Sequence, residues 1–304
     1  MRNLDGQHPK YIAVTVGPRG SDSRPTREHS SVPIIQYVIM AKRKDQHSEE
    51  SLVSAALKKS KRQHSDSDIP SAQQLVVDLN AQDAETFQSN FIPLASLSYT
   101  PRSPIDGPSY HVSFKESADL EPSELNACFD LIATTSRADY EPSSFGWHPS
   151  RKRSEMIEDD MRYFLVRRQD ASPTIEKQGK TRIDTSIEGF LSFQICHDSV
   201  PLVTVLYIYE IHLSASLRGL GMGAHLMQLA EDIAAKVQVE KVMLTVFVSN
   251  SKALGFYRSR GYVVDACSPG DRRTRNKIVR MDHFIMSKIV KREAGESKEP
   301  EANE

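Results

Sequence analysis

The sequence predicts an α/β fold, a mixed (α+β-like) central sheet of six or seven strands flanked by helices, over residues 108–289. Two observations support this prediction. Residues 189–196 and 202–213 are dense in Val, Ile, Leu and aromatic side chains, as strands buried on both faces are. After them, helical and strand patterns alternate up to a last strand at residues 281–287, an order typical of a mixed sheet.

The first half of this region is predicted to contain two strands and a helix. Residues 110–114 alternate apolar and polar side chains, which predicts a strand. A helix is predicted to begin near Glu121, because Pro122 and early acidic residues are typical of a helix start. Residues 163–166 predict a short strand, and a polar, hairpin-like segment continues to about residue 187.

The second half is predicted to alternate helices with strands. Apolar residues recur every three or four positions over residues 221–237, which predicts a helix. Residues 241–247 then predict a strand, residues 251–260 a helix and residues 261–264 a strand. This order continues the sheet and leaves a glycine-rich loop before the first of these helices.

Both ends of the chain differ from this region in composition. Residues 1–107 are rich in Ser, Pro, Gln, His and charge without a sustained period, so we expect a mostly disordered basic tail with one local helix at residues 49–59. Its basic clusters resemble nuclear-localisation or nucleic-acid patches, but a solvated tail explains them equally well. Translation from Met1 or from Met40 stays open, and residues 290–304 predict a charged disordered tail.

Composition excludes several classes of protein. The longest apolar runs, such as residues 202–209, are far shorter than the ~20 residues that span a bilayer, and the first residues contain no apolar signal segment. The three cysteines, Cys128, Cys196 and Cys267, are widely separated, which excludes a disulfide framework and a cysteine-rich zinc site. We therefore expect neither a membrane anchor nor a bound metal.

The most informative motif is the glycine loop of residues 218–224. Glycines let backbone N–H groups approach an anion, and the start of the following helix adds a positive dipole end. The loop loosely fits the dinucleotide pattern G-x-G-x-x-[GA], but it lies deep in the domain and no acidic residue ends the next strand. We therefore do not expect a Rossmann fold. We expect the loop to bind a phosphate or pyrophosphate group.

Within this loop, Arg218, Gly221 and Gly223 fill the pattern R-x-x-G-x-G. Asn250 directly precedes the helix predicted at residues 251–260, and Tyr257 lies in it. At these residues the chain resembles the GNAT superfamily of acyl-CoA N-acyltransferases. The resemblance implies a GNAT fold and acetyl-CoA as co-substrate. The positions it implies for acetyl-CoA are Ile211, His212, Leu213, Arg218, Gly219, Leu220, Gly221, Met222, Gly223, Ala224 and Asn250.

Longer stretches at residues 140–147, 152–156, 207–213 and 241–247 resemble the NatD-type N-alpha-acetyltransferases. This resemblance implies acetylation of the free N-terminal Ser of core histones that begin Ser-Gly-Arg-Gly. We expect histone tails as partners, a monomer, no direct nucleic-acid binding by the domain, and a place in the nucleus and cytoplasm. The implied substrate-contact positions are Tyr140, Phe145, Trp147, Tyr207, Tyr209, Thr245 and His283.

The chain departs from the NatD pattern at three places. Phe145 stands where the family has the first tryptophan of its W-G-W element, and His283 stands in place of a tyrosine. The family's acidic pair is displaced or replaced around residues 194–198. These departures leave open how strict the peptide specificity is.

The chemistry requires a neutral amine, whose reference pKa is about 7.7–8.0, so a nearby base helps. By resemblance Glu210 is the expected base; alternatively its carboxylate only binds the positive peptide terminus. Tyr257 either donates a proton to the departing thiolate or only packs beside it. Asn250 has a second role available as a helix N-cap, and we expect the His212 side chain to face away from the chemistry.

Three functions remain open at this stage. The first is a histone N-terminal serine acetyltransferase in which the amine attacks acetyl-CoA directly. The second is a GNAT enzyme that acetylates lysine side chains or small amines. The third is a catalytically weak module that binds acyl-CoA or chromatin.

Overall fold

The computed structural model describes residues 68–102, 108–169, 174–175, 181–182, 186–199, 202–273, 275 and 277–290. The helix predicted at residues 49–59, the basic clusters before it and after it, and most of the predicted C-terminal tail lie outside the described residues. Among the described residues, no helix combines the length and the apolar character needed to cross a membrane.

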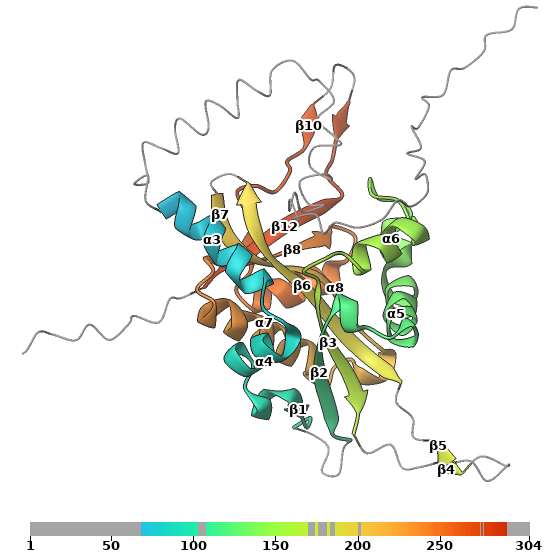
Figure 1. The fold of residues 1–304 in the computed structure, drawn as a ribbon. Coiled ribbons are helices and arrows are strands. Elements are labelled where there is room, and N and C mark those ends of the chain that lie inside the picture. The colour runs from blue at the N-terminus through green and yellow to red at the C-terminus, as the bar shows by residue number, and fades with distance from the viewer. Residues whose placement is uncertain are drawn as a thin grey trace, which may run out of the picture.

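The main sheet has eight strands in the order β1-β2-β3-β6-β7-β8-β12-β9 (Figure 1). Its strands are β1 (Ser98–Tyr99), β2 (Tyr110–Glu116), β3 (Arg162–Arg168), β6 (Ile187–Ser199), β7 (Leu202–Leu213), β8 (Lys241–Phe247), β9 (Val263–Val264) and β12 (His283–Ile289). Every neighbouring pair is antiparallel except β7 and β8, which run parallel. The mixed sheet is therefore confirmed, with one strand more than predicted.

The remaining elements are helices and two small hairpins. The helices are α3 (Asp68–Asn80), α4 (Ala84–Phe91), α5 (Pro122–Tyr140), α6 (Pro149–Met156), α7 (Met222–Lys236) and α8 (Ser251–Ser259), with short 3-10 turns η1 (Leu94–Leu97), η2 (Ser117–Asp119) and η3 (Ala215–Leu217). The hairpins pair β4 (Thr174–Ile175) with β5 (Thr181–Arg182), and β10 (Arg272–Arg273) with β11 (Ile278–Val279).

Helices cover both faces of the sheet. Alternation along β3 sends Phe164 and Val166 into a core that includes residues of α3, α4, α7 and α8. The same alternation sends Tyr163 and Leu165 into a second core with α5 and α6. As Figure 1 shows, α5 and α6 lie together on one side of the domain. The site described below is on this side and at the end of the β7–β8 pair.

Helix α5 forms where the sequence predicts it. Glu121 and Glu124 make a capping box, in which each side chain accepts a hydrogen bond from the other's backbone. Pro122 occupies the first turn, where its missing N–H costs nothing. The buried side chains Cys128, Phe129 and Ile132 pack α5 against the sheet. This packing fixes the direction of the helix, and its C-terminal end lies at the pocket described below.

The prediction that residues 1–107 form a tail outside the domain is wrong for the described residues 68–102. Five side chains of this segment are buried in the core: Val76, Leu79, Phe87, Ile92 and Leu97. The strand β1 also pairs with β2 at the edge of the main sheet. The apolar residues of α3 and α4 lie three or four positions apart in otherwise polar sequence, so average composition conceals two short amphipathic helices.

Phe87 anchors this segment, and its replacement tests that role. The ring is fully buried, 4.9 Å from the Phe91 ring and 5.5 Å from the Phe114 ring, with the Arg162 guanidinium 4.4 Å from its centroid. We expect Phe87→Ala to lower the free energy of unfolding by about 3–5 kcal/mol, measured by urea titration.

Leu94 provides the matched control, because it is 75% exposed in the same segment. Leu94→Ala should change the free energy of unfolding by less than about 0.5 kcal/mol. Equal stability of the two variants would show that residues 68–102 do not belong to the cooperative core.

Candidate active site

The site begins where two parallel strands separate. Backbone pairing of β7 with β8 covers only residues 205–208 and 241–244, although β7 continues to Leu213 and β8 to Phe247. A bulge adds Tyr209 to β7, since Ile208 pairs with Phe193 and Glu210 with Ser192. A bulge shifts the alternation of side chains, so Tyr209 and Glu210 both face the side of α5 and α6.

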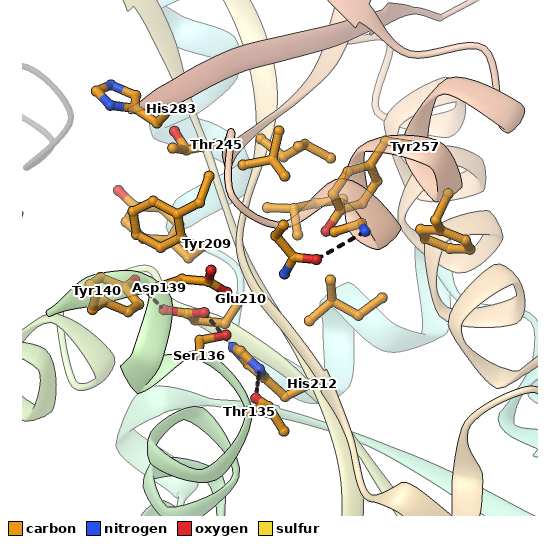
Figure 2. Close-up of a pocket in the computed structure, with 18 of the residues that line it drawn as sticks. Thr135, Ser136, Asp139, Tyr140, Tyr209, Glu210, His212, Thr245, Tyr257 and His283 are labelled. Carbon is orange, nitrogen blue, oxygen red and sulfur yellow. Dashed lines mark hydrogen bonds and ion pairs between the residues drawn. The ribbon is translucent and has the colours of Figure 1, made fainter. Parts of the chain in front are cut away.

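A large pocket occupies this opening (Figure 2). Tyr257 enters it from α8, whereas Thr135 and Tyr140 enter from α5 on the other side. The predicted site residues that line it are Tyr140, Phe145, Trp147, Tyr207, Tyr209, Glu210, Ile211, His212, Leu213, Arg218, Gly219, Gly221, Gly223, Ala224, Thr245, Asn250, Tyr257 and His283. The structure therefore brings these positions, far apart in the chain, to one place.

Two residues of the predicted loop do not line the pocket. The Met222 side chain is fully buried among the core residues below α7. The backbone carbonyl of Leu220 accepts a 2.6 Å hydrogen bond from the hydroxyl of Tyr99, a residue of β1. The expected contact of these two residues with acetyl-CoA stays a prediction, and for the buried Met222 it would be made by the backbone.

The glycine loop is shaped for an anion. Gly221 caps α7 with a φ of +88°, a conformation that favours glycine, and no side chain caps the helix. The first four N–H groups of a helix have no partner within it, so this end offers donors and a positive dipole end. A Cβ at Gly221 would lie 2.4 Å from the Tyr99 hydroxyl, so Tyr99 closes the back of the loop.

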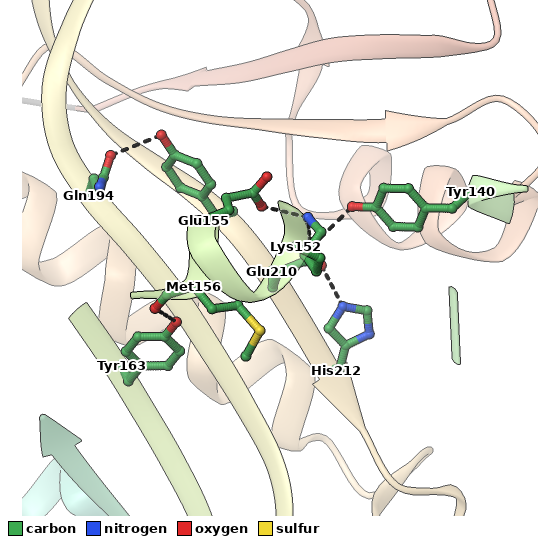
Figure 3. A network of polar contacts seen from close by, with 9 residues as sticks. Tyr140, Lys152, Glu155, Met156, Tyr163, Gln194, Glu210 and His212 are labelled. Carbon is green, nitrogen blue, oxygen red and sulfur yellow. Dashed lines mark hydrogen bonds and ion pairs between the residues drawn. The ribbon is translucent and has the colours of Figure 1, made fainter. Parts of the chain in front are cut away.

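A cluster of charged side chains lies on the opposite wall. Oε1 of Glu210 accepts hydrogen bonds from Lys152 Nζ at 2.8 Å and from the Tyr140 hydroxyl at 3.2 Å. Oε2 lies 2.5 Å from His212 Nε2. Lys152 Nζ also donates to Glu155 Oε1 at 2.5 Å, so its ammonium bridges two carboxylates (Figure 3).

These contacts set the charge of each group. Burial by itself raises the pKa of Glu210, but the attraction of Lys152 and then of His212 outweighs it and holds the pKa at about 2. Burial lowers the pKa of Lys152, yet Glu210 and Glu155 raise it well above its ordinary value. Burial raises the pKa of Glu155 and outweighs the effect of Lys152. Glu210 and Lys152 are thus charged at neutral pH.

The expected role of Glu210 as base is not tested by these contacts and stays a prediction. A carboxylate with a pKa of about 2 is a weak proton acceptor, and both its oxygens already have partners. The expectation that His212 faces away is wrong, because its ring joins Glu210 to the Thr135 hydroxyl, 2.6 Å from Nδ1. The bulge before Glu210 turns both side chains toward α5.

Aromatic and polar side chains form the remaining wall. The Tyr207 and Thr245 hydroxyl oxygens are 2.5 Å apart, and the Tyr209 hydroxyl donates to Gln194 Oε1 at 2.9 Å. The rings of Phe145 and His283 have centroids 4.7 Å apart. These contacts hold the predicted substrate-contact residues in fixed orientations.

Three hydrogen bonds fasten the end of α5 and the segment after it across the pocket. The Ser249 hydroxyl donates to Asp139 Oδ1 at 2.6 Å, which joins α5 to the loop before α8. The Ser144 hydroxyl donates to Asp282 Oδ1 at 3.1 Å, and the Ser144 backbone N–H also donates to Asp282. The segment around Ser144, which we call the roof of the pocket, is therefore joined to Asp282, directly before β12.

Asn250 and Tyr257 enter from the side of α8. The Asn250 side chain accepts a 3.1 Å hydrogen bond from the Ala253 N–H, which confirms the N-cap role. Its contact with a cofactor remains a prediction. Burial and then Glu210 raise the pKa of Tyr257, so its phenol stays protonated at neutral pH and is able to donate a proton.

One group outside the pocket has the donor atoms of a metal site: Asp198, Asp265 and Cys267. The ammonium of Lys241 already lies among them, 2.7 Å from Asp198 and 3.0 Å from Asp265. Burial and the neighbouring Asp265 raise the pKa of the Cys267 thiol to about 12, which disfavours the thiolate that a metal needs. A lysine thus supplies the positive charge at this place.

Sequence reasoning missed the site roles of Lys152, Glu155 and Thr135. Lys152, Glu155 and Met156 lie three and four positions apart, so they share one face of α6. Met156 is buried, and its face therefore points inward. The apolar Met156 in a very polar helix was the available signal that Lys152 and Glu155, on the same face, point toward the interior.

Residues 133–262 match the model of the Acetyltransferase (GNAT) family. Among solved structures, the chain is similar to Arabidopsis thaliana NAA60 at 14% identity and a TM-score of 0.42, over 59% of this chain and 99% of that chain. It is also similar to the ribosomal-protein-S18-alanine N-acetyltransferase of Escherichia coli at 19% identity and a TM-score of 0.37, over 61% and 97% of the two chains. The mixed sheet with its flanking helices is a GNAT fold, and the match to the family model covers its residues 133–262.

Proposed function

We propose that this chain is an N-alpha-acetyltransferase that moves acetyl from acetyl-CoA to the free N-terminal Ser of core histones beginning Ser-Gly-Arg-Gly. The observation that carries the proposal is the position of Glu210. This carboxylate, which attracts an ammonium group, directly precedes the stretch of β7 that runs along the opening. The sequence resemblance to NatD-type enzymes supports the choice of Ser-Gly-Arg-Gly as the acceptor peptide. For an enzyme that acts on histones, we propose a place in the nucleus and cytoplasm.

The residues present fit acetyl-CoA. The N–H groups at the start of α7 would hold the pyrophosphate, with the exposed Arg218 beside them. In the described sheet, β7 has no strand partner on its β8 side beyond Ile208, so Ile211 and the Leu213 N–H offer an open edge, while Arg218 Nε donates to the Leu213 carbonyl at 3.1 Å. Pantetheine would add to this edge as an extra strand does. Acetyl-CoA supplies the acetyl group as a thioester.

Direct attack by the amine agrees with the state of the cysteines. Burial raises the pKa of Cys128, Cys196 and Cys267 to about 12. A protonated thiol is a poor nucleophile, so none of the three is suited to carry the acetyl group. The Tyr257 phenol lines the pocket and, in this proposal, protonates the departing sulfur.

The next question is which acidic side chains could recognise the arginine at the third position of the peptide. The acids expected to supply the charge of the replaced family pair are Asp198 and Glu141. Asp198 is 2.7 Å from Lys241, and Glu141 is 2.7 Å from Arg137, so both already have cationic partners. Gln194 is held between the Tyr209 hydroxyl and the carbonyl of Asp159. We therefore propose a weaker preference for arginine than the family pattern implies.

Peptides test the acceptor. A free Ser-Gly-Arg-Gly peptide should gain one acetyl group at its α-amine, and the N-terminally blocked peptide with lysines should gain none, as read by mass spectrometry. Replacing Arg by Glu should raise KM by less than ~10-fold, an effect that shrinks at high salt because exposed charges are screened.

Other outcomes would favour the remaining functions. Acetylation of lysine in the blocked peptide would indicate a lysine or small-amine acetyltransferase. Binding of acetyl-CoA without product would indicate a binding module. Equal kcat/KM for a peptide beginning Met-Leu would contradict the serine specificity and leave the acetyltransferase activity standing.

Gly221→Ala tests the anion loop. The added Cβ would meet the Tyr99 hydroxyl in a backbone conformation that side chains rarely adopt. We expect the Kd for acetyl-CoA, measured by calorimetry, to rise at least ~10-fold. Gly255→Ala in α8 is the control, since no atom lies within 4 Å of its Cβ, and it should leave the Kd unchanged. Unchanged affinity in a folded Gly221→Ala variant would place the pyrophosphate elsewhere.

Asp282→Asn tests the roof over the pocket. Burial raises the pKa of Asp282, but His283 and then Ser144 outweigh it and hold the pKa at about 2, so the carboxylate is ionised. Loss of its charge weakens both hydrogen bonds from Ser144 and should raise KM for the peptide roughly 3- to 10-fold. KM for acetyl-CoA should stay unchanged; an equal rise in both would indicate general loosening of the domain instead.

A further inference from the structure

Three carboxylates line the pocket: Asp139, which accepts a hydrogen bond from Ser249, and Glu155 and Glu210, which both contact Lys152. Glu210 shares one oxygen with Lys152 and Tyr140 and the other with His212. Glu155 shares Oε1 with Lys152, and no described residue donates to its Oε2. The Glu155 side chain is also the more accessible, at 17% exposed against 8% for Glu210. Of the two carboxylates that contact Lys152, Glu155 thus has the acceptor atom open to an incoming group.

The charges leave room for one more cation. Lys152 neutralises one of the two carboxylates it touches, so the three groups together carry one negative charge when Glu155 is ionised. The face of the Tyr140 ring lies 5.0 Å from the Lys152 ammonium, as in sites that bind ammonium ions. A substrate with a positive amino terminus would balance this charge, whereas an anionic substrate would not.

We propose that Glu155 takes the proton from the substrate's ammonium group, and that Glu210 and Lys152 position Glu155 for this role. The inference rests on the proposed function, because it needs an amine as acceptor. Environments that move two nearby carboxyl pKa values apart separate their roles. Here the pKa of Glu155 is raised by burial, which outweighs Lys152, while that of Glu210 is held at about 2 by Lys152 and His212 against burial.

The step balances as follows. The Glu155 carboxylate accepts one proton from the ammonium and becomes a carboxylic acid, which leaves a neutral amine. The C–N bond forms as the thioester C–S bond breaks, with the bonding pair of electrons leaving on sulfur. The Tyr257 phenol gives its proton to the sulfur, which yields the thiol of coenzyme A, and regains a proton from the second proton lost by the nitrogen. Glu155 returns its proton to water through its exposed side.

The pH dependence follows from the groups around Glu155. Activity needs the carboxylate form, so it is lost as the pH falls through the raised pKa of Glu155. The titratable and charged groups that face the cluster come from α5, α6, the loop after α6 and β7. They are Tyr140, Arg151, Lys152, Glu158, Tyr209, Glu210 and His212.

The experiment measures the release of coenzyme A with the Ser-Gly-Arg-Gly peptide between about pH 6 and about pH 9.5, for wild type, Glu155→Gln, Glu210→Gln and Glu158→Gln. Glu155→Gln should lose at least ~10²-fold in kcat/KM near neutral pH. Its deficit should shrink below ~10-fold at the alkaline end, where the amine, with a pKa of about 7.7–8.0, is already neutral. A purely structural role would not produce this recovery.

Glu210→Gln should instead lose a similar factor at every pH and keep the acid limb of the profile. Glu158→Gln is the matched control, because Glu158 follows α6, has a pKa raised to about 7 by burial and then Glu155, and does not line the pocket. It should match wild type. The melting temperature and the Kd for acetyl-CoA of each variant check the fold.

A second measurement uses the wild type alone, so it does not depend on any variant folding. The ¹³C NMR signal of the Glu155 carboxyl, assigned with Glu155→Asp, should titrate together with the acid limb of kcat/KM. A deficit of Glu155→Gln that stays the same up to the alkaline end, or titration of Glu210 at the pH of the wild-type acid limb, would overturn the inference. Absence of product with wild type would overturn the proposed function and this inference together.

Discussion

The separation of β7 from β8 is the constraint on which the site depends. The two strands pair over only four residues, and one bulged residue, Tyr209, changes which way the rest of β7 faces. The separation leaves a free strand edge, and the bulge turns Glu210 and His212 toward α5 and α6. A donor molecule and an acceptor amine can therefore approach the same short stretch of backbone from two sides.

Burying charge at this place has a cost that the fold meets locally. An isolated carboxylate is destabilised in a dry site, so Glu210 remains ionised only because Lys152 and His212 contact it. The same contacts make it a poor proton acceptor. Glu155, at the edge of the cluster, keeps an open oxygen and more contact with water. One ammonium group, that of Lys152, therefore contacts both carboxylates. It stabilises the charge of Glu210 and leaves one oxygen of Glu155 open.

The sequence predicted elements whose pattern is strong and local. The bounds of β8 match the predicted residues 241–247, and the helix α7 differs from its prediction by one residue at each end. The segment around Phe87 and the short helix α6 were missed, because their few apolar residues are diluted by charge. The pairing of Lys152 with Glu210 links residues 58 positions apart, and no local pattern encodes such a contact.

The departures from the NatD pattern show how the two halves of the site differ. Phe145 and His283 replace larger aromatic residues, and their rings contact each other, so the two changes belong to one patch. Gln194 contacts Tyr209 on the neighbouring wall. Under the proposed function these positions would face the acceptor, whereas Arg218, Gly221 and Gly223 still fill the pattern R-x-x-G-x-G. The proposed acetyl-CoA would need one fixed shape of this loop, whereas a wall that binds a peptide would be free to change together with the peptide.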